Sequence, residues 1–246
     1  SMSPDTSTPP QPTAEQQLAV ESITVALERG TARAFLLHGV TGSGKTEVYL
    51  RAVARAAALG KRAIVLVPEI SLTPQTLSRF IGRFPGQVAV MHSRLTPAEH
   101  LDQWSRVRQG QYSVVVGSRG AVFSPQPDLG LIVLDEEHEW TYKQVDTSPR
   151  YHAREVALKL AEICGAVVVL GSATPDVESY YRSQRGEYSL LRLSGRISRR
   201  GTPSSLPAVS LVDMREEWKA GNRGLFSREL RQVLGHGCVV RGLCRI

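Results

Sequence analysis

Residues 39–46 carry the densest set of residue types that could bind a phosphate. They read Gly-Val-Thr-Gly-Ser-Gly-Lys-Thr and match the pattern G-x-x-x-x-G-K-[ST]. Glycines let successive backbone N–H groups turn inward around phosphate oxygens, where a Cβ would obstruct them. Lys45 can reach the β- and γ-phosphates of a nucleotide, and the Thr46 hydroxyl can ligate Mg²⁺. The pattern therefore predicts a site for a nucleoside triphosphate and Mg²⁺ formed by Gly39, Thr41, Gly42, Ser43, Gly44, Lys45 and Thr46.

Three carboxylates, Asp135, Glu136 and Glu137, follow a short apolar run at Leu131–Leu134. Ligands of open α/β sheets bind at the carboxyl ends of the strands, which is where a buried strand would deliver these side chains. Asp135 is the expected partner of Mg²⁺, through water, and Glu136 could polarise the water that attacks the terminal phosphate. A solvated acidic turn is the alternative interpretation. Combined with the phosphate loop, the run predicts a nucleoside triphosphatase whose metal is held by Thr46 and Asp135.

Apolar runs of four or five residues alternate with longer segments of helical pattern over most of the chain. The runs are nearly continuous Val, Ile and Leu, as expected for strands that are covered on both faces of a parallel sheet. The pattern predicts an α/β fold, a mostly parallel sheet with helices on both faces, in which the strand before Asp135 neighbours the strand before the phosphate loop. Expected strands are residues 34–38, 63–67, 88–91, 113–116, 131–134 and 167–170. Expected helices are residues 14–29, 45–59, 73–84, 97–108, 150–164 and 175–185.

Positive charge is concentrated near the end of the chain. The 246 residues include 30 Lys and Arg against 23 Asp and Glu, a formal net charge of +7. From Arg182 onward there are 13 Lys and Arg against 5 Asp and Glu, whereas the preceding residues are nearly balanced. Such a surplus is typical of a surface that follows a phosphate backbone, and the alternative is a solvated, Arg-rich segment. The distribution thus points to a polyanionic partner.

Composition limits the remaining classes of protein. Hydrophobic residues make up 41% of the chain, but no apolar run approaches the roughly 20 residues needed to cross a bilayer, so no membrane partner is expected. Cys164, Cys238 and Cys244 cannot form a disulfide framework, and they fit a reducing cytoplasm.

Three regions are expected along the chain. Residues 1–12 are polar and rich in proline, which predicts a flexible N-terminal segment. Residues 13–194 carry the alternating pattern of the α/β domain. In residues 195–246 Gly, Ser and Arg accumulate around one strand-like run at Val209–Val212, which predicts a basic linker that leaves the domain.

Two short runs resemble motifs of the superfamily 2 DEXH helicases. Asp135-Glu136-Glu137-His138 resembles their D-E-x-H motif, and Gly171-Ser172-Ala173-Thr174 resembles their S-A-T motif. Five longer runs within about residues 12–214 resemble the primosomal replication-restart helicases, namely residues 39–49, 66–75, 135–144, 149–157 and 170–179. The resemblance implies the first RecA-like motor domain, a P-loop NTPase domain that uses ATP, of a 3'-5' type DNA helicase in replication restart. It also implies single-stranded and forked DNA as partners, with primosome or single-strand-binding proteins in the full-length family.

The resemblance assigns further residues to ATP and to DNA. Gln16 or Gln17 matches the glutamine that reads the adenine edge, and the two adjacent glutamines leave the choice open. Two loops at strand ends touch the DNA backbone in such helicases, and the matching residues are Pro68, Glu69, Ser71 and Arg119. Hydroxyls, backbone amides and an arginine can bind phosphate without reading sequence. Arg119 could equally be a salt-bridge partner at the rim of the core.

An aromatic-rich loop follows the D-E-x-H run and is implied by the resemblance to contact DNA. Its matching residues are Trp140, Tyr142 and Lys143. An aromatic ring offers a stacking face worth roughly 1–3 kcal/mol per base, and the alternative is that Trp140 packs beneath the loop. The residues implied to couple hydrolysis to DNA movement are His138, Ser172 and Thr174.

Parts of the family pattern are missing from the sequence. It has no Q-x-x-G-R-x-G-R run, so the arginine finger of a second motor domain is not expected, and residues 195–246 should include only a truncated start of that domain. Zinc is expected for the full-length family, but three cysteines exclude a Cys₄ zinc site in this chain. We therefore expect weak ATP hydrolysis and no duplex unwinding by this chain alone. The alternatives are a nucleotide-independent DNA- or partner-binding module with a vestigial ATP site, and a small-molecule kinase or transporter-type ATPase.

Overall fold

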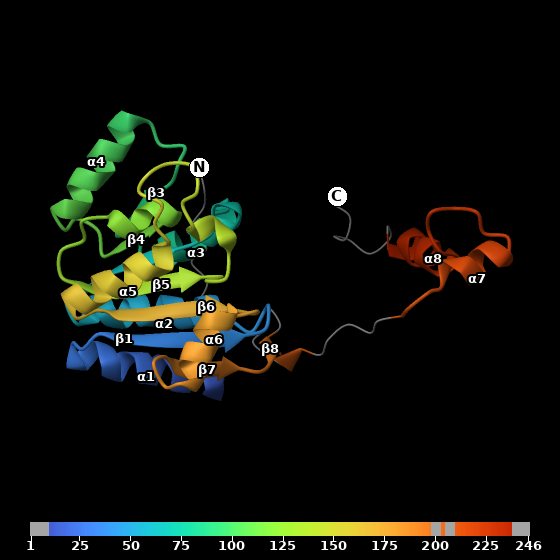
Figure 1. Cartoon of the computed structure of the whole chain (residues 1–246), viewed down its shortest axis with the longest axis horizontal. Coiled ribbons are helices and arrows are strands. Elements are labelled where there is room, and N and C mark those ends of the chain that lie inside the picture. Colours follow the sequence, from blue (N-terminus) through green and yellow to red (C-terminus); the bar gives the residue numbers. More distant parts are fainter. Residues whose placement is uncertain (1–9, 198–202, 205–209, 238–246) are drawn as a thin grey trace. The chain divides into compact units, whose positions relative to one another are not determined.

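The computed structural model describes residues 10–197, 203–204 and 210–237 (Figure 1). The chain divides into two compact units, residues 1–204 and residues 205–246. The first unit holds the sheet, and the second holds two short helices, α7 (Met214–Lys219) and α8 (Arg228–Gly237). All the residues predicted to bind nucleotide or DNA lie in the first unit.

A seven-stranded sheet in which every pairing is parallel forms the centre of the first unit. The strand order is β3-β4-β2-β5-β6-β1-β7. The strands are β1 (Arg33–Gly39), β2 (Arg62–Leu66), β3 (Val88–Met91), β4 (Val114–Gly117), β5 (Leu129–Asp135), β6 (Val167–Ser172) and β7 (Ser189–Leu193). The Val-, Ile- and Leu-rich strands β4, β5 and β6 are buried almost throughout, which confirms the predicted parallel α/β fold.

Helices cover both faces of the sheet (Figure 1). They are α1 (Ala14–Arg29), α2 (Lys45–Ala58), α3 (Pro74–Arg83), α4 (Pro97–Arg108), α5 (Ala153–Cys164) and α6 (Val177–Gln184). One apolar layer contains Ile23 of α1, Val48 of α2 and Phe80 of α3. The other contains Val107 of α4 and Ala157 of α5. Short 3₁₀ turns follow three strand ends, η1 (Glu69–Ser71), η2 (Arg119–Phe123) and η3 (Trp140–Tyr142).

Several helices of the first unit start at a residue whose side chain caps the helix. The Thr13 hydroxyl accepts from the Gln16 backbone, and the Gln16 side chain accepts in return from the Thr13 backbone. Thr96 and Glu99 make the same reciprocal pair at the start of α4. Helix α5 begins at Ala153 rather than at residue 150, because His152 pairs with Lys143 in a β-bridge and its ring accepts from the Arg154 backbone.

Strand β7 is absent from the sequence prediction. It reads Ser-Leu-Leu-Arg-Leu and lies at the edge of the sheet, where β1 is its one partner among the described strands. It is half-buried over most of its length. An edge strand needs less continuous apolar sequence than a central one, so its signal is weaker. Beyond it, the two-residue strands β8 (Arg196–Ile197) and β9 (Pro203–Ser204) pair antiparallel.

The helices of the second unit are also absent from the sequence prediction, which gave a basic linker with one strand-like run. Residue 209 lies outside the described residues, and residues 210–213 form no strand, so the expected strand at Val209–Val212 is not seen in the part that is described. The side chain of Asn222 links the two helices, because its amide donates to the Glu217 carboxylate of α7 and its Oδ1 accepts from Arg231 of α8. The expected functional boundary at residues 194 and 195 stays a prediction, because compactness alone does not show where a motor domain ends.

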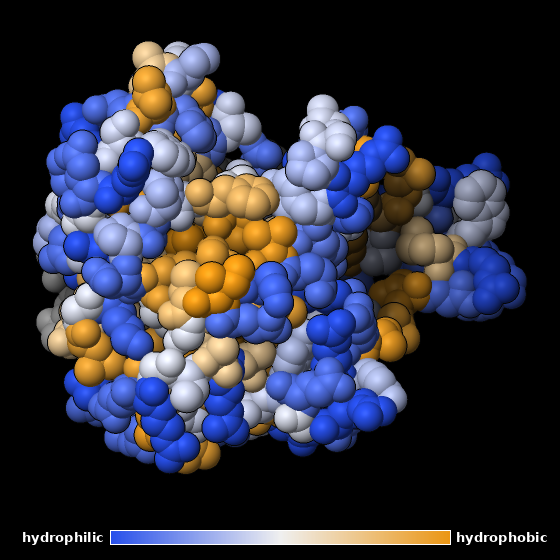
Figure 2. Space-filling model, turned by 60° about the vertical axis from the view of Figure 1, so that its left-hand side comes forward, coloured by the Kyte–Doolittle hydropathy of each residue, from blue (hydrophilic) through white to orange (hydrophobic). Residues whose placement is uncertain are grey.

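Apolar side chains are not confined to the core. Figure 2 shows one face on which hydrophobic side chains gather in a central area and hydrophilic ones surround them. Among the described residues, Leu101, Ile163 and Ile70 are large apolar side chains that remain exposed. Within the same residues, the helices are too short or too polar to cross a bilayer.

Candidate nucleotide site and nucleic-acid interface

The phosphate loop and the acidic run lie at the same edge of the sheet, where the parallel strands end. The loop follows β1, and Asp135 is the last residue of β5. The expectation that these two strands are neighbours is wrong, because β6 lies between them and its Gly171 is in register with both Leu37 and Asp135. Strand order is set by the crossover connections and not by sequence order. The two motifs therefore face each other across the end of one intervening strand.

The phosphate loop has the backbone shape that its glycines predict. Gly42 and Gly44 have φ angles of 82° and 83°, in the left-handed region, and the Ser43 N–H donates to the Val40 carbonyl. At Gly39 a Cβ would lie 2.5 Å from the Ser43 hydroxyl. That hydroxyl is buried and has no hydrogen-bond partner among the residues that the structure describes. Helix α2 starts directly afterwards without a side-chain cap, so its first N–H groups are free to bind an anion.

Lys45 is buried between the loop and the acidic run. Its ammonium donates to the Gly39 carbonyl at 2.8 Å and lies 3.6 Å from Glu136 Oε1. Glu136 has a φ of 46°, which is uncommon for a residue with a Cβ and typical of strain held at functional sites. Thr46 follows Lys45 in the first turn of α2, where it is half-buried. The loop thus brings a cation and a hydroxyl to the carboxylate edge.

Asp135 is held by two buried tyrosines. The Tyr49 hydroxyl donates to Asp135 Oδ1 at 2.9 Å, and the Tyr142 hydroxyl donates to the Asp135 main-chain carbonyl at 2.7 Å. Burial, followed by the charge of Glu136, raises the pKa of Asp135 to about 6. Burial also raises the pKa of both phenols well above the ordinary value, so they stay protonated donors. A hard cation is the natural partner of such a carboxylate, and Thr46 supplies a second oxygen of the type that Mg²⁺ prefers.

Only one of the two adjacent glutamines reaches the phosphate loop. Gln16 is 3% exposed, and its amide donates to the Ser43 and Gly44 carbonyls at 3.1 and 3.3 Å. Gln17 is exposed and donates to Glu21 on the surface of α1. The geometry therefore favours Gln16 for the proposed contact with the base.

The three residues expected to couple hydrolysis to movement form one group beside Glu136. A hydrogen bond of 2.7 Å joins His138 Nδ1 and the Ser172 hydroxyl, and His138 Nε2 lies 3.5 Å from the Thr174 hydroxyl. The Thr174 N–H donates to the same Ser172 hydroxyl. His138 Nδ1 is also 3.7 Å from Glu136 Oε2. The end of β6 is thus tied to the acidic run at the end of β5.

A buried ion pair that the sequence analysis missed lies behind this group. Arg154 Nη1 lies 3.2 Å from the Glu137 carboxylate, and both side chains are almost fully buried. Glu137 also accepts from the Ser179 hydroxyl and from the Asp176 N–H, both at 2.8 Å, while Arg154 reaches Glu178. Chemical roles were assigned to Asp135 and Glu136 from the sequence, but none to Glu137. A third carboxylate without a role was the signal in the sequence that could have indicated this ion pair. The pair joins β5, α5 and the start of α6.

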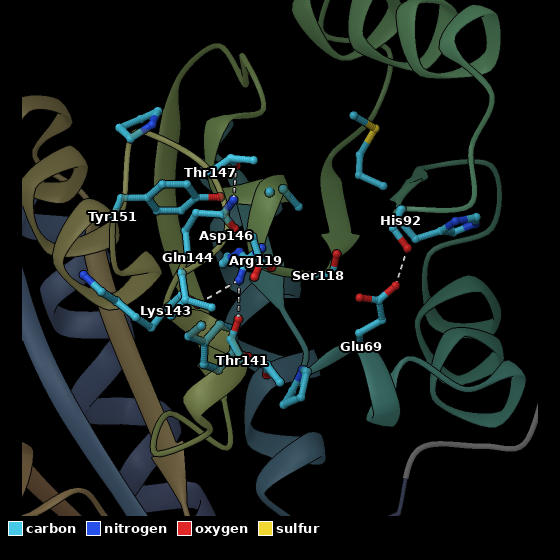
Figure 3. A pocket seen from close by; sticks show the side chains of 18 of the residues that line it. Glu69, His92, Ser118, Arg119, Thr141, Lys143, Gln144, Asp146, Thr147 and Tyr151 are labelled. Carbon is cyan, nitrogen blue, oxygen red and sulfur yellow. Dashed lines mark hydrogen bonds between the residues drawn. The ribbon is translucent and has the colours of Figure 1, made fainter.

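A pocket of about 710 Å³ lies beside the nucleotide edge, at the ends of β2, β3 and β4 (Figure 3). Six of the residues predicted to contact DNA line it: Pro68, Glu69, Arg119, Trp140, Tyr142 and Lys143. Ser71, the seventh, lies in η1 and does not line it. Ser118 and Gln144 also line the pocket. Glu69 accepts from the Ser93 hydroxyl, so one wall carries a carboxylate.

The aromatic-rich loop (residues 140–151) forms one wall of this pocket. Trp140 is 71% exposed, so it does not pack beneath the loop, whereas Tyr142 is buried against Asp135. Arg119 donates to the Thr141 and Lys143 carbonyls at 3.0 and 2.8 Å, as Figure 3 shows, and no described carboxylate pairs with it. Arg119 therefore holds the loop in place, while Trp140 is the aromatic face open to a ligand.

Relatives of this chain are found among replication restart proteins. "Replication restart protein PriA" of Bacillus subtilis (strain 168) is 54% identical over 222 residues, which cover 90% of this chain and 27% of that protein. The protein of the same name from Chlamydia pneumoniae is 44% identical over 216 residues, 87% of this chain and 28% of that protein. The chain thus spans about a quarter of the length of these curated relatives.

Solved structures share the fold. RecG bound to a three-way DNA junction aligns with a TM-score of 0.57 and 24% identity over 76% of this chain and 24% of its own. The helicase domain of Pyrococcus furiosus Hef aligns with a TM-score of 0.53 and 18% identity, covering 75% of this chain and 38% of its own. The sheet is therefore of the RecA-like type found in helicases. A sequence model of the DEAD/DEAH box helicase family matches residues 13–182, which contain both motifs and the S-A-T run, and the chain belongs to that family.

Proposed function

We propose that this chain is the ATP-binding and ATP-hydrolysing motor domain of a DNA helicase of 3'-5' type that acts in replication restart. The observation that carries the proposal is the approach of Lys45, at the start of α2, to Glu136, which follows Asp135 at the end of β5. The similarity to replication restart proteins named PriA supports the cellular role. With DNA as its substrate, the protein is proposed to act in the cytoplasm, at the nucleoid.

Different residues at the carboxyl ends of the strands bind the phosphates, hold the metal and activate the attacking water. The N–H groups of Gly42, Gly44, Lys45 and Thr46, together with the Lys45 ammonium, bind the phosphates. Gln16 lies where it can read the base. Thr46 and Asp135 would hold Mg²⁺, which supplies positive charge to the transferred phosphoryl group. Glu136 orients the attacking water and accepts its proton. Burial of Lys45 strengthens its interaction with the phosphates because little water screens it.

DNA is proposed to bind along the pocket at the ends of β2, β3 and β4. Trp140 offers an exposed ring for stacking on an unpaired base, and Lys143 adds positive charge. Tyr142 donates a hydrogen bond to the Asp135 carbonyl, and the Trp140–Tyr142 turn also lines the pocket. A shift of the loop on DNA binding would therefore move a residue that contacts Asp135. His138, Ser172 and Thr174 are proposed to carry the state of the nucleotide to the end of β6.

The chain on its own is proposed to be a slow ATPase that does not unwind duplex. Motors of this superfamily hydrolyse ATP between two RecA-like domains, and the seven-stranded sheet of the first unit belongs to one such domain. An arginine finger from a second domain contributes roughly a thousandfold or more to turnover. Primosome and single-strand-binding proteins are proposed as partners only in the full-length context, and not for this chain alone.

The test is the rate of ATP hydrolysis by wild type and Lys45→Ala, with and without single-stranded DNA. DNA-stimulated turnover that Lys45→Ala abolishes would support the motor. DNA affinity that is indifferent to nucleotide, with no turnover in either protein, would support the alternative of a binding module with a vestigial site. Processive unwinding by the 246-residue chain would contradict the proposed weakness of the isolated domain.

A further inference from the structure

Lys45 and Tyr49 lie one turn apart on α2 and meet the two carboxylates at the end of β5. Residues four apart on a helix project from the same face. The Lys45 ammonium lies 3.6 Å from Glu136 Oε1, and the Tyr49 hydroxyl donates to Asp135 Oδ1 at 2.9 Å. The helix that begins at the phosphate loop therefore contacts both members of the acidic pair. The proposed nucleotide site accounts for the first contact but not for the second.

Tyr49 reaches Asp135 across the end of β6. Gly171 is the β6 residue in register with Asp135, and a Cβ on it would lie 1.6 Å from the Tyr49 hydroxyl and 2.7 Å from its Cζ atom. The φ angle of Gly171 is not in the left-handed region, so backbone freedom does not explain the glycine. What this position requires is the absence of a side chain, which leaves room for the phenol.

We infer that Tyr49 is a positioning residue that fixes the orientation of the Asp135 carboxylate toward the metal of the proposed nucleotide site, and that Gly171 keeps the path of the phenol open. The inference rests on the proposed function, because that function supplies the metal. A hydrogen bond to Oδ1 restricts rotation of the carboxylate, which would hold the metal directly or through its water. Removal of such outer partners of metal ligands typically costs roughly 10–100-fold in metal affinity or activity.

A purely structural role for Tyr49 makes a different prediction. The residue is 2% exposed and packs in the apolar layer with Val48 and Val133. A phenylalanine would fill the same space, so a packing role would leave the metal dependence of nucleotide binding unchanged. Tyr49→Phe removes only the hydroxyl and therefore separates the two roles.

The test measures binding of a fluorescent ADP analogue to the 246-residue chain, without metal and across a Mg²⁺ titration, so that no hydrolysis is required. The variants are Tyr49→Phe and Gly171→Ala. Tyr188→Phe is the control for the first, because this buried phenol loses a hydrogen bond with Arg182 instead. Gly195→Ala is the control for the second, because a Cβ there meets no atom of the described residues within 4 Å.

We expect Tyr49→Phe to weaken the Mg²⁺-dependent part of the affinity by about tenfold or more, with the metal-free affinity unchanged. Gly171→Ala should do the same, because its Cβ displaces the phenol, and both controls should keep wild-type behaviour. Wild-type Mg²⁺ dependence in Tyr49→Phe, or an equal loss of metal-free affinity, would overturn the inference and leave the proposed function standing. A wild-type chain that binds no nucleotide would overturn the proposed function and the inference with it. Should Gly171→Ala fail to fold, Tyr49→Phe decides alone.

Discussion

At the scale of single residues, Glu136 is the side chain on which hydrolysis should depend most. It is one of two non-glycine residues with positive φ among the described residues, and it contacts Lys45 and lies near His138. Holding a residue in this region costs free energy of order 1–3 kcal/mol, so the surrounding contacts must enforce it. A carboxylate placed in this way can accept a proton from water, whereas an amide cannot.

Glu136→Gln should therefore retain ATP binding and lose turnover by roughly a hundredfold or more. The measurement pairs nucleotide affinity with a single-turnover hydrolysis rate. Asp128→Asn is the matched control, because Asp128 is the other described non-glycine residue with positive φ and directly precedes β5, at the opposite end of the strand from Glu136. Turnover at the wild-type rate in Glu136→Gln would assign the proton acceptor to another group.

Trp140 offers a second test at this scale, since its ring is 71% exposed beside the pocket. Trp140→Ala should leave the unfolding free energy and basal hydrolysis almost unchanged, while DNA binding loses roughly 1–3 kcal/mol. Basal and DNA-stimulated ATPase rates, measured with Trp218→Ala as a control for another exposed tryptophan, give the comparison. An equal fall in both rates would instead indicate that Trp140 stabilises the loop.

At the scale of elements, the pair formed by Glu137 and Arg154 closes the base of the aromatic-rich loop, because its members lie on either side of residues 140–151. Removing one partner of a buried ion pair typically costs roughly 3–5 kcal/mol, since the other charge is left without compensation. Replacing both partners costs less than the sum of the single changes, because no lone charge remains.

Arg154→Met should therefore lower the unfolding free energy by several kcal/mol, about 3 or more, and Glu137→Gln combined with Arg154→Met should recover part of it. Urea unfolding of the single and double variants measures both quantities. Arg55→Met, which breaks the surface pair with Glu28, should change stability by less than about 1 kcal/mol. Additive effects in the double variant would show that the two buried charges do not interact.

The sequence predicted the central strands of the sheet but not their order. Continuous runs such as Val114–Val116 and Leu131–Leu134 predicted the central strands, because strands covered on both faces have no polar alternation to obscure them. The phosphate-loop pattern likewise predicted a loop that needs glycines, and Gly42 and Gly44 have positive φ angles that glycine adopts freely. Strand order is a tertiary property, so the position of β6 between β1 and β5 was out of reach, and with it the path of Tyr49 across Gly171.

The sequence alone also could not decide which of two adjacent residues reaches the site, or which residues distant in sequence are in contact. Gln16 and Gln17 are equivalent in sequence, and only the register of α1 turns the first toward the phosphate loop. Arg154 meets Glu137 because α5 packs against the end of β5, and the two are 17 residues apart in sequence. The partners of Arg119 could not be predicted either, because they are main-chain carbonyls, which no pattern of side chains in the sequence can indicate.

At the scale of the whole molecule, charge should govern the encounter with DNA. The surplus of 13 Lys and Arg over 5 Asp and Glu from Arg182 onward extends over both units, so it acts as a general field rather than as one site. Binding that neutralises phosphates releases counterions, and the logarithm of the affinity then falls linearly with the logarithm of salt concentration, by roughly 0.7 per phosphate for single strands.

We expect affinity for single-stranded DNA to fall steeply with salt, with a slope of about −2 or steeper if three or more phosphates are contacted. Lys143→Ala, at the pocket, should make the slope shallower by about 0.7, because one phosphate contact is lost. Lys159→Ala should leave it unchanged, since this exposed lysine of α5 is paired with Glu162 and does not line the pocket. Fluorescence anisotropy over a salt series measures all three slopes. A flat profile for wild type would mean that the basic surplus is solvated surface, and an equal change in both variants would mean that the field, and not the pocket, sets the contact.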